Sequence, residues 1–321
     1  MISVAMTTYN GEKYIRKQIE SILNQSMKVD EIIVCDDGST GKTVEILKEY
    51  PVTVYQNEKN LGYRLNFKKA MSLCTHEYTF LCDQDDIWEP DKVKIMIEIM
   101  QKNPNIHVLA SSFVYIDSKD DPIYMKQKKN WSNNNLYPKK VLENDLVQVK
   151  FDEYFSCNYF QGCSLVLDKW IKDLVLENFD SRLPHDWLLS MIASSYQGMY
   201  FYNKPLFRYR LHDNNSIGVE YLTHSTGEHI QKASSTELRM QNSLNALIVL
   251  EDVEKMNPAF YETREKEFKE LKKFLVKHNQ NLENKSFFGL LIQNTQPFYK
   301  MIKSYGSCVC VEKIIIMVLR I

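Results

Sequence analysis

The sequence predicts an α/β protein, with a parallel sheet covered by helices on both faces and a helical appendage at its C-terminal end. Short apolar segments alternate with amphipathic segments through about the first hundred residues, which is typical of βαβ units. The apolar segments show no polar alternation, as expected for strands that are covered on both faces. Beyond about residue 225 the segments become long, charged and periodic, which indicates helices.

The first-half elements are each supported by their apolar pattern. Strands are expected where short apolar runs stand alone, at residues 2–6, 31–35, 52–55, 78–82 and 108–116. Helices are expected where apolar residues recur at helical spacing, at residues 12–24, 43–49, 65–73 and 91–101. Residues 117–150 are polar, rich in Lys and Asn and weakly patterned, so we expect a loop over the active face.

The second half continues with two further strands, at residues 158–168 and 199–209, the latter broken by Pro205. Helices are expected at residues 187–195, 236–255 and 259–278. Hydrophobic residues make up 44% of the 321 residues, which permits a large core. The net charge of −1 argues against a general nucleic-acid binder.

Three carboxylates follow the strand at residues 78–82, in the sequence Asp83-Gln84-Asp85-Asp86. Carboxylates this close repel one another when they lose solvent, so a fold needs a reason to keep them together. A hard divalent cation such as Mn²⁺ or Mg²⁺ is the usual reason, often shared with a phosphate. The alternative is capping of the helix at residues 91–101, which suits Asp86 better than Asp83 or Asp85.

Two other strand ends carry groups suited to a nucleoside. Asp36 and Asp37 precede a glycine, so their carboxylates could accept from a base or from ribose hydroxyls where the backbone comes close. Thr8, Tyr9 and Asn10 end the first strand, where the aromatic ring could stack on a base. The alternatives are an Asp-Gly turn with Asx hydrogen bonds at the first place and an ordinary strand–turn–helix junction with an Asn/Gly turn at the second.

A third loop contains Asn60, Gly62 and Arg64. The guanidinium of Arg64 matches the oxygen geometry of a diphosphate. The alternative is a solvated arginine beside a glycine turn.

These motifs resemble the nucleotide-binding half of the family 2 inverting glycosyltransferases. The resemblance covers roughly residues 1–215 and lies in the order of the segments at residues 8–11, 36–39, 60–62 and 83–86. The form Asp-Gln-Asp-Asp-Ile-Trp is close to the rhamnosyltransferase-like members. The resemblance implies a GT-A fold, which is a Rossmann-like, mixed and mostly parallel sheet. It also implies a catalytic domain at residues 1–220, with a nucleotide-binding half at 1–100 and an acceptor-binding half at 101–220, and an appendage at 221–321.

The resemblance also implies roles for individual residues. Asp83 would contact the ribose and Asp85 would hold the metal, with Asp86 as support. Asp186, in a His-Asp variant of the family's Glu-Asp pair, would be the general base. In the Arg-x-His segment, His212 would complete the metal shell or touch the diphosphate, and Arg210 would add a phosphate contact. The acceptor side would be lined by Gly162, His185 and Trp187.

The predicted reaction is transfer of a sugar, rhamnose among the candidates, from a UDP- or dTDP-activated donor to a glycan or lipid-linked glycan acceptor in surface polysaccharide synthesis. A sugar-1-phosphate nucleotidyltransferase is less favoured, because residues 7–17 lack a glycine-rich basic loop. A non-catalytic scaffold is the other alternative, although a pure binding module needs no separate base such as Asp186.

Neither a signal peptide nor an apolar run of about 20 residues is seen, so we expect a cytoplasmic protein. The apolar and basic tail at residues 309–321 suggests peripheral contact with the inner membrane surface. The alternatives for this tail are packing on the appendage and a contact within a homo-oligomer.

Overall fold

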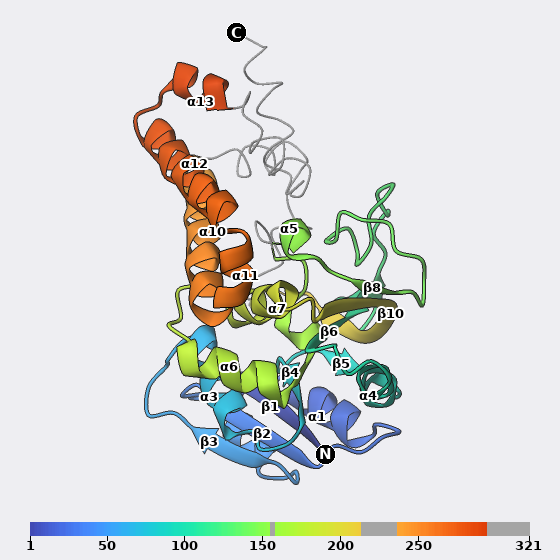
Figure 1. The fold of residues 1–321 in the computed structure, drawn as a ribbon. Helices are drawn as coiled ribbons and strands as arrows, with labels where there is room; N and C mark the ends of the chain where they lie inside the picture. Colours follow the sequence, from blue (N-terminus) through green and yellow to red (C-terminus); the bar gives the residue numbers. More distant parts are fainter. Residues whose placement is uncertain (155–157, 213–235, 294–321) are drawn as a thin grey trace. The chain divides into compact units, whose positions relative to one another are not determined.

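The computed structural model describes residues 1–154, 158–212 and 236–293, which fall into two compact units (Figure 1). The first unit contains residues 1–149 and 159–212, and the second contains residues 150–158 and those after 212. The predicted boundary at residue 220 and the predicted tail at 309–321 lie outside the described residues.

A ten-stranded mixed sheet forms the centre of the first unit. Four parallel strands make up the half predicted to bind the nucleotide, in the order β3 (Thr53–Gln56), β2 (Glu31–Asp36), β1 (Ile2–Thr8) and β4 (Tyr78–Cys82). The order continues with β9 (Leu165–Asp168), β6 (Val108–Ile116), β10 (Met199–Arg210) and β5 (Ile87–Trp88). Strand β9 runs antiparallel to both β4 and β6, and β10 runs parallel to β6. This is the mixed, mostly parallel sheet that was predicted.

Helices cover both faces of this sheet, because consecutive parallel strands need crossover connections. On one face lie α3 (Tyr63–Leu73) and α6 (Lys169–Asn178), with α7 (His185–Ser195) beside them (Figure 1). The other face carries α1 (Ile15–Leu23), α2 (Thr43–Leu47) and α4 (Lys92–Lys102). The carboxyl ends of β1, β2 and β4 therefore meet at one edge, where the predicted motifs lie.

The structure corrects three predictions in this unit. The expected loop at residues 117–150 contains β7 (Pro122–Ile123) and β8 (Leu146–Gln148), which add to β6 and β10, and buries Tyr137. The expected strand at 158–168 begins with a 3₁₀ turn, η1 (Gly162–Ser164), because Ser164 turns back to bond the carbonyl of Gln161. Pro205 shifts the register of β10 without ending it.

The second unit is helical. It contains α5 (Phe151–Tyr154), α10 (Thr236–Met256), α11 (Pro258–Thr263), α12 (Glu265–Glu283) and α13 (Phe287–Gln293). The prediction of a single helix at 259–278 is wrong, because the helix is interrupted at Arg264, which separates α11 from α12. The guanidinium of Arg264 is bonded to Asp152 and Glu267 and lies 5.1 Å from the ring centre of Phe260. Among the residues that the structure describes, no helix has the length and apolar character needed to cross a bilayer.

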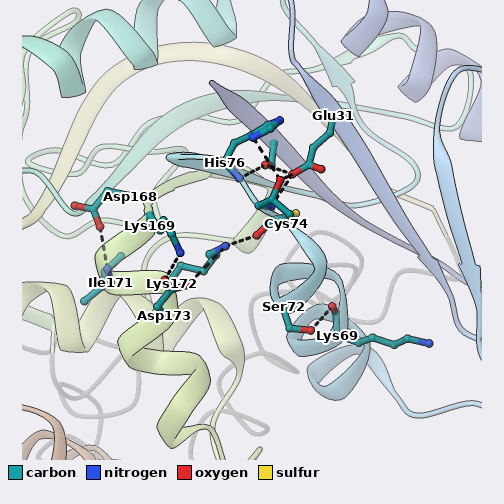
Figure 2. Close-up of polar contacts among 12 residues, drawn as sticks. Glu31, Lys69, Ser72, Cys74, His76, Asp168, Lys169, Ile171, Lys172 and Asp173 are labelled. Carbon is teal, nitrogen blue, oxygen red and sulfur yellow. Dashed lines mark hydrogen bonds and ion pairs between the residues drawn. The ribbon is translucent and has the colours of Figure 1, made fainter.

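The amino ends of the parallel strands are joined by a separate polar cluster (Figure 2). One oxygen of Glu31 accepts from the hydroxyl of Ser3 (2.5 Å) and from the backbone N–H of Thr75 (2.7 Å). The ammonium of the buried Lys172 donates to the carbonyl of Cys74 at 2.5 Å. These bonds tie β1, β2 and α6 to the turn that precedes β4.

Replacing Glu31 with Gln is expected to lower the free energy of unfolding by about 1 kcal/mol at pH 7, because a neutral acceptor makes weaker hydrogen bonds. Burial acts to raise the pKa of Glu31, but the hydrogen bonds from Ser3 and Thr75 outweigh it, so the pKa lies below its usual value. A lowered pKa contributes stability above the unfolded-state value of about 4.3, and this contribution is lost as the pH falls through the folded-state pKa.

Urea denaturation at several pH values measures the difference in free energy of unfolding between Glu31→Gln and the unmodified protein. Because the contribution of the Glu31 charge is lost in acid, this difference should disappear at acidic pH. Glu77→Gln, at an exposed position on the same edge, is the control. A difference between Glu31→Gln and the unmodified protein that persists unchanged at acidic pH would contradict the assignment.

Candidate active site

Asp36 fixes the end of β2 to the end of β1. Its carboxylate accepts from the hydroxyl of Thr8 (2.8 Å) and from both the backbone N–H (2.8 Å) and the hydroxyl of Ser39 (2.5 Å). Asp36 is fully buried and Thr8 nearly so. Their bonds shape the loop, and contact of either with a nucleotide stays a prediction.

Asp37 organises the neighbouring loop after β3. Its carboxylate accepts from the side chain of Asn57 (2.9 Å) and from the backbone N–H groups of Leu61 (2.7 Å) and Gly62 (2.9 Å). Asp37 is itself buried, and its contact with a nucleotide stays a prediction. Gly62 has a φ of 79°, a left-handed conformation that favours glycine, although a Cβ there would meet no atom within 4 Å. Asn60 accepts from the N–H of Gly62 at 2.9 Å.

The loop after β1 presents Tyr9 to solvent, with 47% of the residue exposed. Its backbone is held by Gln84 of the carboxylate loop, which accepts from Tyr9 N–H at 2.8 Å and donates to its carbonyl at 3.1 Å. Asn10, with φ of 49°, accepts from the N–H of Thr40 at 3.0 Å. An exposed ring on a fixed backbone suits stacking on a base.

The carboxylate loop after β4 brings Asp83, Asp86 and Cys163 together, with one potential ligand atom of each within 4.8 Å of the others. One oxygen of Asp86 accepts from the backbone N–H of Arg210 at 3.0 Å, and the other is buried without a hydrogen-bond partner in the described part of the chain. Burial raises the pKa of Asp86 well above its usual value, and the charges of Asp85 and Asp83 add to the effect. Burial likewise raises the pKa of the Cys163 thiol, which makes it a poor ligand for a hard cation.

Asp85 and His212 lie against each other, with 2.8 Å between the Asp85 carboxylate and Nε2 of His212. Both side chains are only slightly exposed. The two residues predicted to hold a metal are therefore neighbours, although metal binding by them stays a prediction.

Arg210 is placed differently from its predicted phosphate contact, because its side chain is fully buried. It donates to the carbonyls of Asp85 (2.7 Å) and Asp117 (2.9 Å), pairs with Asp120 and lies over the ring of Tyr14. A phosphate contact would require it to leave these partners. In this structure Arg210 stabilises the carboxylate loop by donating hydrogen bonds to the Asp85 carbonyl and to the Asp86 carboxylate.

Lys92 is a second buried cation at this site, which the sequence motifs did not reveal. It donates to the carbonyl of Cys163 at 2.7 Å and lies between the rings of Trp88 and Phe207. Burial lowers its pKa to about 8, so it remains charged at neutral pH. It gives the acidic cluster a fixed positive charge.

Asp186 lies in the first turn of α7, where its carboxylate accepts from the N–H of Trp187 at 2.8 Å. The pKa of Asp83 is raised to about 7, chiefly by burial and then by the charge of Asp85, with Asp186 contributing. The roles of Asp83 at the ribose and of Asp186 as the base stay predictions.

His185 precedes Asp186 in the chain, and its ring stacks on Phe67 with 4.0 Å between ring centres. Burial lowers its pKa, so its ring is neutral at pH 7. Both ring nitrogens are buried without a hydrogen-bond partner among the described residues. A Cβ on Gly162 would lie 2.8 Å from Nε2 of His185, so the glycine leaves room for this ring. The nearby Trp187 is 5% exposed.

Arg64 is partly exposed, and its guanidinium bonds to backbone carbonyls of the protein. It donates to the carbonyls of Ser181 and Arg182, both at 3.0 Å, in the loop that leads into α7. It therefore connects the nucleotide-side loop with the helix of Asp186, and its predicted phosphate contact stays untested.

The sheet and its helices define the fold class, an α/β fold of the GT-A type. A search of solved structures supports the fold, because S. aureus TarS, residues 1–349 in complex with UDP, matches with a TM-score of 0.52 at 15% identity, over 89% of this chain and 92% of that one. The sequence profile of glycosyl transferase family 2 matches residues 3–161.

Two curated relatives agree with that profile. The chain is 29% identical over 234 residues to the dTDP-rhamnosyl transferase RfbG of Shigella flexneri, covering 67% of this chain and 74% of that protein. It is 25% identical over 247 residues to an uncharacterized glycosyltransferase of Haemophilus influenzae, covering 75% and 73%. The chain belongs to glycosyltransferase family 2, whose members use a nucleotide-sugar donor.

Proposed function

We propose that this glycosyltransferase moves a sugar from a UDP- or dTDP-activated donor to a hydroxyl of a glycan acceptor, with inversion at the anomeric carbon. The observation that supports the proposal is the gathering of the strand-end motifs at one edge of the sheet, where Asp36 bonds Thr8, Gln84 bonds Tyr9 and Asp85 lies 2.8 Å from His212. UDP is supported by the TarS complex, and dTDP-rhamnose by the name of the Shigella relative. A glycan or lipid-linked glycan of a surface polysaccharide is the proposed acceptor, from the resemblance alone.

In the proposed reaction, an acceptor hydroxyl attacks the anomeric carbon from the face opposite the diphosphate. The new C–O bond forms as the bond to the diphosphate oxygen breaks, and the bonding pair leaves with the nucleoside diphosphate. Asp186 takes the hydroxyl proton as the new bond forms. Tyr9 and Asp37 would bind the base and Asp83 the ribose.

The residues present fit a divalent metal, because carboxylate oxygens are hard donors and one buried oxygen of Asp86, next to Asp85 in the chain, has no hydrogen-bond partner among the described residues. Asp85 and His212 would hold Mn²⁺ or Mg²⁺, with Asp86 in support. When bound, the ion would neutralise negative charge on the leaving diphosphate.

A thermal-shift panel with UDP, dTDP, GDP and CDP, with Mn²⁺ or with EDTA, tests the proposal. One nucleotide should stabilise the protein only in the presence of metal, by roughly 2.7 kcal/mol at a hundredfold excess over its Kd. Asp85→Ala should remove this stabilisation and leave the melting temperature of the free protein nearly unchanged.

Asp91→Ala, at an exposed carboxylate just beyond the motif, is the control and should respond as the unmodified protein does. A large loss of stability in Asp85→Ala with normal nucleotide binding would favour the capping interpretation. No response of the unmodified protein to any nucleotide would favour a non-catalytic scaffold.

A further inference from the structure

Gln84 stands between two acidic residues of the motif, yet its side chain serves the loop after a different strand. The ladder between β1 and β4 ends at the pair Met6 and Cys82. Beyond that point, the amide of Gln84 accepts from the N–H of Tyr9 (2.8 Å) and donates to its carbonyl (3.1 Å). The side chain thereby continues the connection between the two strands after their backbones have separated.

Gly11 shows how closely this amide fits. A Cβ at this position would lie 2.2 Å from Oε1 and 2.6 Å from Cδ of Gln84, far inside contact distance. Gly11 is not among the glycines with positive φ, so an alanine could adopt its backbone conformation. Glycine is therefore needed there for the space that Gln84 occupies.

The Tyr9 loop also bonds to the loop after β2. Asn10 donates its N–H to the hydroxyl of Ser39 at 2.8 Å, and Ser39 in turn bonds Asp36. The side chain of Gln84 thus links the loops after β1 and β2 to the carboxylate loop at residues 83–86. Through it, the position of the exposed Tyr9 ring depends on the position of the acidic loop.

We infer that Gln84 is a positioning residue for the donor: it holds the Tyr9 loop and the carboxylate loop in the relative arrangement that binds base and diphosphate together. The inference rests on the proposed function. Its physical basis is preorganisation, because a loop that is already ordered loses less entropy when the nucleotide binds. The effect belongs to donor binding and not to the chemical step.

The test compares Gln84→Ala, Gly11→Ala and the double variant. Each single variant should weaken binding of the stabilising nucleotide, UDP or dTDP with Mn²⁺, about tenfold by calorimetry, since two hydrogen bonds to the loop are lost or distorted. The donor KM should rise by a similar factor, and kcat at saturating donor should stay within about threefold. The melting temperatures should change little.

The double variant gives the sharpest outcome. Once the Gln84 side chain is absent, a Cβ at position 11 no longer collides with it. The double variant should therefore bind the nucleotide as Gln84→Ala does, about tenfold more weakly than the unmodified protein. Two independent losses would instead multiply to about a hundredfold. Gln84→Met keeps most of the length without the paired hydrogen bonds and should show the same tenfold loss, which covers the case that Gln84→Ala folds poorly. Gln101→Ala, at an exposed position on α4, is the control.

Unchanged nucleotide affinity in both Gln84→Ala and Gln84→Met would overturn the inference, as would additive losses in the double variant or a fall in kcat without a change in affinity. If the unmodified protein binds neither UDP nor dTDP, the proposed function fails and the inference fails with it. If the unmodified protein binds one of them and the Gln84 variants bind equally well, only the inference fails.

Discussion

Asp186→Asn is expected to lower kcat for sugar transfer about a thousandfold, with donor affinity nearly unchanged, because positioned general bases contribute roughly 10²–10⁴ in rate. An amide cannot take the proton of the acceptor hydroxyl. It can still accept the hydrogen bond from the N–H of Trp187 that the carboxylate accepts at 2.8 Å. The first turn of α7 should therefore remain intact, and the substitution isolates the loss of the base.

Transfer from a radiolabelled donor, with calorimetric binding of the nucleoside diphosphate alongside, measures this prediction. Asp145→Asn, at an exposed carboxylate of the same unit, is the control and should be fully active. Equal transfer rates for Asp186→Asn and the unmodified protein would remove Asp186 as the base. A loss of nucleotide affinity as large as the loss of rate would make it a binding group instead.

The strands β1, β2 and β4 could be predicted because burial on both faces gives each a continuous apolar run. The helices before β4 could be predicted from their spacing. The short strands β7 and β8 could not, because two or three residues carry no period, and pairing with β6 and β10 decides their conformation.

The candidate site could be predicted only as far as its strand-end motifs reach. The sequence places Asp36, Asp83 and Asp186 at suitable positions, but it does not show which polar groups hold them. Gln84 bonds a backbone 75 positions away, and Arg64 bonds a carbonyl 117 positions away. Backbone groups are the same in every residue, so such partners leave no pattern in the sequence.

The predicted phosphate contact of Arg210 shows the same limit of sequence-based prediction. A motif containing arginine beside a diphosphate site favours a phosphate contact, whereas the folded chain buries this side chain completely. Burial of a cation in a fold is supported only when carbonyl and carboxylate partners surround it. These partners come from residues 85, 117 and 120, which only the tertiary structure brings together.

Arg210→Met should therefore lower the free energy of unfolding by about 3 kcal/mol, in the range for removing one partner of a buried ion pair. The substitution would remove the guanidinium donor that the carbonyls of Asp85 and Asp117 now have at 2.7 and 2.9 Å, although the Asp117 carbonyl would keep the N–H of Asp120. Because the first of these carbonyls belongs to the carboxylate loop, metal-dependent nucleotide binding should weaken as well. Urea denaturation followed by circular dichroism gives the stability, and calorimetry with UDP or dTDP and Mn²⁺ gives the binding.

The neighbouring Arg208→Met is a closely matched control. The side chain of Arg208 is 45% exposed and makes a surface ion pair with Glu89, and such pairs contribute about 0–1 kcal/mol. The two substitutions remove the same charge from one strand, so burial is the main difference between them. Should Arg210→Met unfold like Arg208→Met and yet bind the nucleoside diphosphate far more weakly, the phosphate contact predicted from the sequence would be the better account. A loss of stability in Arg210→Met but not in Arg208→Met would instead show that Arg210 stabilises the carboxylate loop through its buried hydrogen bonds.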